Sequence, residues 1–226
     1  MSNDAKGCYD CIAHVVVDLA LRRLGIPKPA LQSMIEAIQN MEHHIRTAFG
    51  DSEEHYGNDG GPPPQVLLQG NGTGPAGWYS IAHLMIKILQ GMGFGYNAIT
   101  PIFQRAFQIT CFAFVDDTNI VHATTDPDKP SADLIQEAQT ALTKWEDLLR
   151  ATGGALAPEK SYWYFLNVIQ KGGHWVYARP TDNNFTLQLG NGYVIQRHHM
   201  DTSQEALGIQ IRPDCSMADE KQVPIG

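Results

Sequence analysis

The sequence predicts an α+β fold, with helices on one face of an antiparallel sheet that is built around a split β-α-β core. Four segments carry apolar residues at helical spacing, and two aromatic and β-branched runs flank Asp116 and Asp117. Beyond Pro158, short strand-like runs alternate with Gly and Asn/Asp turns. Antiparallel strands covered by helices are the economical arrangement of these elements, and a helical domain with a separate β appendage is the alternative.

Two helices are predicted before residue 46. The first covers residues 12–24 and ends where Gly25 and Pro27 supply a stop signal. The second begins at Pro29, which suits a first helical turn, and its apolar stripe continues to Ile45. The apolar faces are predicted to be Ile12, Val15, Val16, Leu19 and Leu24, and then Leu31, Met34, Ile35, Ile38, Met41 and Ile45. The polar, glycine-rich stretch from Phe49 to Pro64 predicts a hairpin tip followed by a loop.

Two longer helices are predicted further along the chain. Pro75 opens one that ends at Gly91 or Gly93. The other begins at Ser131, which can cap a helix, and closes at Gly153 and Gly154. Their apolar faces are predicted to be Trp78, Ile81, Ala82, Met85, Ile88 and Leu89, and then Leu134, Ala138, Ala141, Leu142, Trp145, Leu148 and Leu149.

The central strands are predicted on either side of Asp116 and Asp117. Residues 107–115 and 118–123 are rich in aromatic and β-branched side chains and predict a tight hairpin. Further strands are predicted at residues 161–168, 174–178, 185–189, 193–197 and 206–211.

The composition limits the partners and the compartment of the protein. Lys and Arg number 16 against 24 Asp and Glu, and the net charge of −8 opposes nucleic-acid binding by broad phosphate neutralisation. No apolar run is long enough to span a membrane, and the N-terminus lacks the pattern of a signal peptide. The 4 cysteines are too irregularly spaced for a disulfide framework. We therefore expect an intracellular protein, nuclear or cytoplasmic, with no membrane partner.

The adjacent carboxylates of Asp116 and Asp117 are the strongest local signal for chemistry. They follow Phe114 and Val115 at the predicted hairpin turn. Two neighbouring carboxylates can converge there on divalent cations, which prefer oxygen ligands and bridge to phosphates. Asp-Asp is also ordinary turn chemistry, so the dipeptide alone leaves both interpretations open.

Two further segments favour the metal interpretation. Asp4 lies just before the first helix, five residues ahead of Tyr9. Gln69 and Gly70 begin a glycine-rich loop that leads through Pro75 into a helix, where the backbone can approach a ligand closely.

In this order the segments resemble motifs A, B and C of the palm of reverse transcriptases, especially those of non-long-terminal-repeat retrotransposons. The family's motif A, an Asp followed by an aromatic, is matched by Asp4 with Tyr9. Its motif B, Gln-Gly and then Pro, is matched by residues 69–75, and its motif C, aromatic-x-Asp-Asp, by residues 114–117. Residues 153–160, which end in Lys160, resemble motif D, and residues 205–209 more weakly resemble the next strand, which supports the primer end.

The resemblance implies a fold and an activity. The fold would be a polymerase palm at residues 1–160, with the β-rich end of the palm and the start of the following connection at residues 161–226. The activity would be that of an RNA-directed DNA polymerase acting by two-metal nucleotidyl transfer on an RNA or DNA template, a primer and dNTP. Asp4 and Asp116 would hold two Mg²⁺ or Mn²⁺ ions, with Asp117 as an additional ligand.

The same resemblance implies nucleotide contacts. Tyr9 would lie under the sugar and exclude a 2′-hydroxyl. Gln69 and Gly70 would line the nucleotide and template pocket. Lys160 would protonate or neutralise the departing pyrophosphate.

Several of these residues also have plainer interpretations. Asp4 can be a terminal carboxylate, Tyr9 a core aromatic and Lys160 a loop lysine. Cys8 and Cys11 form a single CxxC pair, and without a second pair buried thiols are favoured over a zinc site.

The sequence departs from the family's pattern around motif A. Only Met1, Ser2 and Asn3 precede Asp4, so we expect the sheet to lack most of one strand. The basic fingers that hold the triphosphate have no counterpart before Asp4. We therefore expect a fragment that binds nucleic acid weakly and is inactive alone, and the alternative is a catalytically silent retroelement remnant that acts at most as a binding module.

Overall fold

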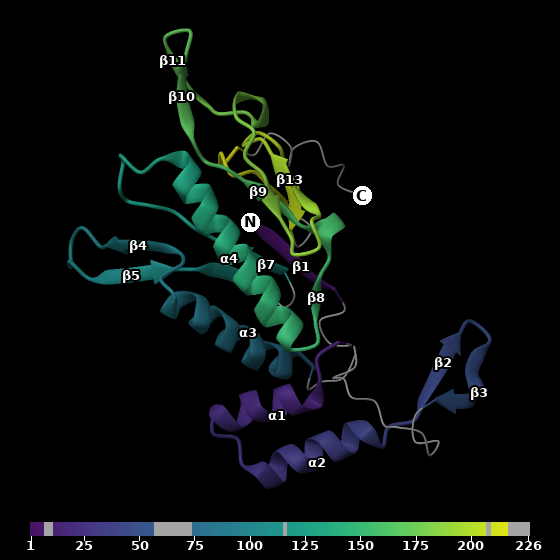
Figure 1. The fold of residues 1–226 in the computed structure, drawn as a ribbon. Helices are drawn as coiled ribbons and strands as arrows, with labels where there is room; N and C mark the ends of the chain where they lie inside the picture. Colours follow the sequence, from purple (N-terminus) through teal and green to yellow (C-terminus); the bar gives the residue numbers. More distant parts are fainter. Residues whose placement is uncertain (7–10, 57–73, 115–116, 207–208, 217–226) are drawn as a thin grey trace.

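The chain folds as a mixed α/β protein (Figure 1). The computed structural model describes residues 1–6, 11–56, 74–114, 117–206 and 209–216. These residues form four α-helices, one seven-stranded sheet and four two-stranded hairpins. The fold class predicted from the sequence, helices together with a sheet, is confirmed at this level.

The central sheet has the strand order β12-β13-β9-β1-β7-β6, and β8 also pairs with β1. Its strands are β1 (Ser2–Lys6), β6 (Cys111–Phe114), β7 (Asp117–Ile120), β8 (Ala155–Leu156), β9 (Tyr162–Tyr164), β12 (Leu187–Gln188) and β13 (Val194–His198). The prediction of a purely antiparallel sheet was wrong at one pair, because β13 runs parallel to β9. Parallel neighbours need a long connection, and the chain between these two strands contains β10 (Val168–Lys171), β11 (His174–Tyr177) and β12. Of the strands after residue 160, β9, β12 and β13 thus join the central sheet, whereas the other four form two separate hairpins.

β1 lies in the middle of this sheet. Ser2 pairs with Asn119 of β7 on one side and with Tyr162 of β9 on the other, and Asp4 pairs with Asp117 of β7. The expectation that the sheet would lack most of this strand was therefore wrong. The five residues of β1 are enough to pair on both sides.

All four predicted helices are present. They are α1 (His14–Arg23), α2 (Lys28–Gln39), α3 (Gly74–Gly91) and α4 (Ser131–Ala151). The predicted stop after α1 is confirmed, because Gly25 has a φ of +91° that favours glycine. The N-terminus of α4 differs from the prediction: Pro130 is the N-cap, Ser131 lies inside the helix, and no side chain caps it.

The buried face of α1 also differs from the prediction. Val15 and Leu19, which were predicted to face the core, are exposed, whereas His14, Val17 and Ala20 are buried. The small and β-branched side chains of this second face let α1 pack closely against α3. Apolar spacing alone could not distinguish the two faces.

Four hairpins extend from the helices and the sheet. The second helix ends before Ile45, because residues 43–47 form β2 (His43–Thr47), which pairs with β3 (Gly50–Tyr56). The predicted strand from residue 107 divides at Thr110: its first part belongs to β5 (Ala106–Ile109), which pairs with β4 (Tyr96–Ile99). The predicted strand at residues 206–211 is instead a hairpin. The other strands are β10 (Val168–Lys171) with β11 (His174–Tyr177), and β14 (Gln204–Ala206) with β15 (Ile209–Ile211).

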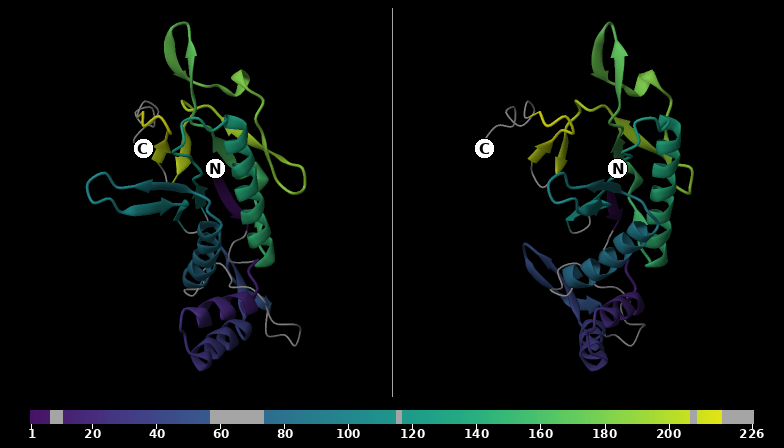
Figure 2. Two further views of the ribbon diagram at one scale, coloured as in Figure 1. Left: turned by 60° about the vertical axis from the view of Figure 1, so that its left-hand side comes forward. Right: turned by 90° about the vertical axis from the view of Figure 1, so that its left-hand side faces the viewer.

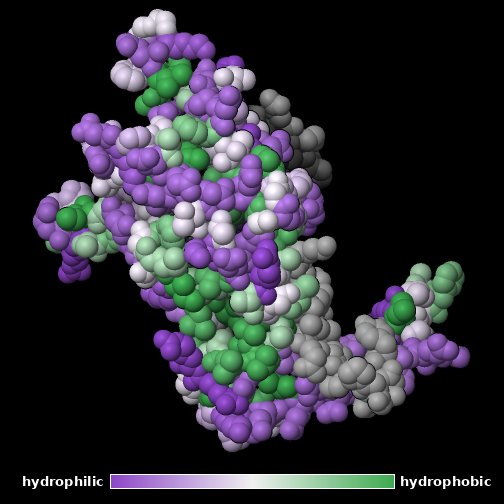
Figure 3. Space-filling view, viewed as in Figure 1, coloured by the Kyte–Doolittle hydropathy of each residue, from purple (hydrophilic) through white to green (hydrophobic). Residues whose placement is uncertain are grey.

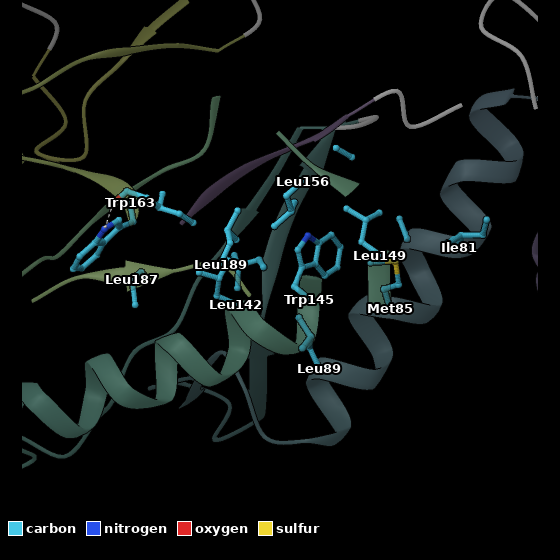
Figure 4. Packing of buried hydrophobic residues seen from close by; sticks show 14 of the residues in the cluster. Ile81, Met85, Leu89, Leu142, Trp145, Leu149, Leu156, Trp163, Leu187 and Leu189 are labelled. Atoms are coloured by element: carbon cyan, nitrogen blue, oxygen red, sulfur yellow. Dashed lines mark hydrogen bonds between the residues drawn. The ribbon is translucent and has the colours of Figure 1, made fainter. Parts of the chain in front are cut away.

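The hydrophobic core lies between the sheet and the helices α3 and α4 (Figure 4). Trp145 of α4 lies near its centre, and Trp163 of β9 donates from Nε1 to the carbonyl oxygen of Ile195 at 3.3 Å. Other members are Ile81, Met85 and Leu89 of α3, Leu142 and Leu149 of α4, and Leu156, Leu187 and Leu189 of the β-rich part. The predicted apolar faces of α3 and α4 are largely confirmed.

The opposite face of the sheet is not covered by α3 or α4. Figure 2 shows α4 along one side of the sheet and the β14–β15 hairpin on the other. Figure 3 shows hydrophobic side chains gathered over α1, α3 and the adjoining end of α4, whereas the region around the β-rich part is mostly hydrophilic.

Candidate functional site

Asp4 and Asp117 face each other across two central strands. The register of the antiparallel strands β1 and β7 makes them direct partners. Paired residues in such a ladder have Cβ atoms about 4.5–5.5 Å apart. Two carboxylates from distant parts of the sequence thus lie side by side, where their charges repel each other unless a cation intervenes.

The alternation of side chains along both strands explains why these carboxylates are on the open face. Asn3 and Ala5 of β1, and Thr118 of β7, are buried toward the core. Their neighbours Asp4 and Asp117 must therefore point the other way. The Asp4 side chain is 19% exposed, and Asp117 is exposed.

Lys160 completes this group. It ends the 3₁₀ helix η1 (Pro158–Lys160), and its Nζ lies 2.9 Å from Oδ2 of Asp4. The turn is attached to β1 by its backbone, because the amide of Ala157 donates to the carbonyl oxygen of Asp4 at 2.9 Å. The Lys160 side chain is 66% exposed, so it can leave the ion pair without disturbing the fold.

These side chains line one end of a cleft of about 380 Å³. The other end is lined by Tyr162 of β9, His198 of β13 and Gln204 of β14. The β14–β15 hairpin, whose residues 205–209 resemble the strand that supports a primer, thus borders the same cleft.

Four of the predicted site residues, Tyr9, Gln69, Gly70 and Asp116, lie outside the described residues. The helix that follows Gln69 and Gly70 in the sequence is described and begins at Gly74 as α3. Pro75 of this helix and Phe114 of β6 line one apolar pocket of about 330 Å³. The start of α3 therefore lies next to the end of β6, the strand that precedes Asp116 in the sequence.

The donor set suits a hard divalent cation, because such ions take carboxylate oxygens and Asp4 and Asp117 supply two of them. Among the residues that the structure describes, no three His, Cys, Asp or Glu side chains form a metal-binding group. A complete coordination shell would need further donors, such as Asp116, a substrate oxygen or water. Cys11 is a free thiol, and its predicted partner in the CxxC pair, Cys8, lies outside the described residues.

The sequence did not indicate the aromatic end of the cleft. Tyr162 and Tyr164 of β9 and His198 of β13 have ring centroids 5.3–5.8 Å apart. The alternation Tyr-Trp-Tyr in residues 162–164 was the available signal, since it puts both tyrosines on one face of the strand and Trp163 on the other. The position of His198 beside these tyrosines could not be predicted, because it depends on the parallel pairing of β13 with β9.

A second polar cluster lies away from the cleft. Glu137 of α4 accepts hydrogen bonds from Lys129 at 2.6 Å and contacts Nε2 of His122 at 2.9 Å. The hydrogen bond from Lys129, and then the contact with His122, hold the pKa of Glu137 below its ordinary value. This cluster links the loop after β7 to α4, and we assign it a structural role.

In comparison with known proteins, no family and no curated sequence matches this chain. Within the described ranges, no helix is both long and apolar enough to cross a bilayer.

Proposed function

We propose that this chain is the palm of a reverse transcriptase of the non-long-terminal-repeat retrotransposon type. The observation that carries the proposal is the meeting of Asp4, Asp117 and Lys160 in one cleft. These residues belong to the segments that resemble motifs A, C and D. Nothing in their sequence spacing requires them to meet, so their convergence supports the resemblance independently of the motifs themselves.

The proposed reaction is nucleotidyl transfer to the 3′-hydroxyl of a primer. Asp4 and Asp116 would hold the two Mg²⁺ or Mn²⁺ ions, with Asp117, the partner of Asp4 in the ladder, as an additional ligand. The bound ions would lower the pKa of the attacking hydroxyl and stabilise the leaving oxygen. Lys160, which is exposed and forms an ion pair with Asp4, would neutralise the departing pyrophosphate.

Primer and template binding is the weak point of the isolated chain. Its net charge is −8, and affinity for nucleic acid depends heavily on phosphate contacts with Lys and Arg. We therefore expect the chain alone to extend a primer weakly or not at all.

The proposal is tested by primer extension on poly(rA) with oligo(dT), dTTP and Mg²⁺ or Mn²⁺, beside Asp4→Asn and Asp117→Asn. Extension, however weak, that each of the two substitutions abolishes is the expected result. Extension that survives both substitutions would contradict the proposed site.

A second outcome would favour the alternative function. If Mn²⁺ binds at Asp4 and Asp117 but no form of the protein extends a primer, the chain is a catalytically silent remnant. The observation that favours this alternative is the ion pair between Lys160 and Asp4, which opposes cation binding at this carboxylate.

A further inference from the structure

The end of the cleft away from Asp4 has the form of a stacking surface. Tyr162 and His198 lie in neighbouring strands with ring centroids 5.3 Å apart, and Tyr164 lies within 5.8 Å of both. The register pairs His198 with Tyr164, so the rings belong to adjacent rows on the same open face. Sheets that present aromatic rings on an open face bind unpaired bases by stacking.

Tyr164 is fixed by a hydrogen bond, because its hydroxyl donates to the carbonyl oxygen of Thr202 at 2.9 Å. Burial raises the pKa of Tyr164 to about 12 and lowers the pKa of His198. The rings are inclined to one another, by 63° between Tyr162 and His198 and by 85° between Tyr162 and Tyr164, so a single base would stack on one ring and meet its neighbour edge-on.

Two amide side chains border these rings. Gln196 is exposed on β13 and pairs with Tyr162 in the register, and Nε2 of Gln204 lies 3.3 Å from Nε2 of His198. Each amide offers both donors and an acceptor, the groups that the edges of nucleobases require.

The charges of the cleft exclude a ligand held mainly by its phosphates. The carboxylates of Asp4, Asp117, Glu159 and Glu205 line it, against the cation of Lys160 among the described lining residues. A polyanion without bases would be repelled here. Affinity for a nucleic acid must come from the base.

We propose that the aromatic part of the cleft binds an unpaired nucleobase of a single-stranded nucleic acid, stacked on Tyr162 with the ring of His198 at its edge, and with a backbone phosphate toward Lys160. The inference rests on the proposed function, because it takes the ligand of the cleft to be a nucleic acid. It adds a base-binding position that lies apart from the carboxylates. Lys160 precedes Tyr162 by two residues and lines the same cleft, so one nucleotide unit can contact both.

The test compares two fluorescein-labelled DNA hexamers, (dT)₆ and an abasic hexamer with the same number of phosphates. Fluorescence anisotropy measures their binding to the full chain at low salt, in EDTA and with Mn²⁺. We expect (dT)₆ to bind about tenfold more tightly than the abasic hexamer in both buffers, since stacking is worth that much per base. Equal affinities for the two hexamers would overturn the inference.

Variants locate the binding. Tyr162→Leu should reduce the preference for (dT)₆ about tenfold, and Tyr162→Phe should retain it, because the ring and not the hydroxyl stacks. Tyr177→Leu, on the β10–β11 hairpin, is the matched control and should change nothing. His198→Asn is the second variant in case Tyr162→Leu does not fold, and it should also reduce the preference. A preference that remains in folded Tyr162→Leu or in His198→Asn would contradict the proposed position.

Failure of this inference and failure of the proposed function would give different results. Mn²⁺ binding that Asp117→Asn abolishes, without any preference for bases, would overturn this inference and leave the proposed function standing. A base preference that Tyr162→Leu removes, without Mn²⁺ binding, would support the base site and contradict the metal-dependent reaction.

Discussion

The ammonium group of Lys160 occupies the position beside Asp4 that a cation would take. Nζ of Lys160 lies 2.9 Å from Oδ2 of Asp4, and Asp4 also pairs with Asp117 of the neighbouring strand. A divalent ion that binds Asp4 must share it with Lys160 or displace the lysine. The Lys160 side chain is 66% exposed, against 19% for Asp4, so solvent screens the pair at the lysine and its free energy is small, within about 1 kcal/mol.

Replacing Lys160 with Met should therefore strengthen Mn²⁺ binding. The expected change is a decrease in Kd of up to about fivefold, the equivalent of an exposed ion pair. Isothermal titration with Mn²⁺ on the parent and the variant measures it. Lys171→Met is the matched control, because Lys171 pairs with Asp182 at 3.5 Å in another part of the molecule. Weaker Mn²⁺ binding in Lys160→Met would show that the lysine does not compete with the ion.

Glu137 gives a second prediction at this scale, concerning acid stability. Its pKa is lowered by Lys129 and His122, so the stabilisation is present above the ordinary glutamate pKa of about 4.3 and is lost as the pH falls through the lower pKa of the folded state. Glu137→Gln should lower the Tm at pH 7 by about 2–4 °C at most. Thermal melts of both proteins between pH 3 and pH 7 should show this difference shrinking toward pH 3. A difference that stays constant over that range would contradict the role given to the carboxylate.

At the scale of elements, the turn after α4 fixes the path of the chain that leads to Lys160. Gly153 follows α4 with a φ of +97°, and a Cβ atom there would lie 2.3 Å from the carbonyl oxygen of Cys11. The chain then forms β8 against β1 and continues through η1 to Lys160. The position of Lys160 thus depends on a close backbone contact that only glycine allows.

Gly153→Ala should destabilise the protein far more than Gly172→Ala. Both glycines have positive φ, but a Cβ at Gly172 meets nothing within 4 Å. We expect a loss of about 1 kcal/mol for Gly172→Ala, from the backbone conformation alone, and of at least about 2 kcal/mol more for Gly153→Ala, because backbone must move. Urea unfolding measures both losses. Equal losses would show that the contact with Cys11 does not constrain the turn.

The elements also show which helices and strands could be predicted from the sequence and which could not. The positions of α3 and α4 and of the β6–β7 hairpin were predictable, because long apolar stripes and the runs around Asp116 and Asp117 are local signals. Near β2 and β3 only a hairpin tip from Phe49 was predicted: Ile45 of β2 was assigned to the apolar stripe of α2, and β3 lies in a polar stretch without a strand signal. β5 was predicted only as the beginning of a strand from residue 107, and β4 was not predicted. The predicted buried face of α1 was wrong for another reason: packing against α3, and not the spacing of apolar residues, decides which side is buried.

At the scale of the whole molecule, the order of the strands in the sheet brings the residues of the candidate site together. Asp4 and Asp117 could be named from their motifs, and their pairing requires only that β1 lie beside β7. The aromatic cluster of Tyr162 and His198 could not be predicted from the sequence, because it depends on the parallel pairing of two strands joined by a long connection. No local pattern in the sequence encodes that neighbour relation.

We expect Asp4 and Asp117 to act together as one cation site. The direct measurement is Mn²⁺ binding by electron paramagnetic resonance to the parent, Asp4→Asn, Asp117→Asn and the double variant, with Asp182→Asn as a control outside the cleft. The account predicts that each single substitution weakens binding by at least about tenfold and that the double variant loses little more, because residues of one site are not additive. Binding that is unchanged in both single variants, or losses that simply add, would contradict a shared site.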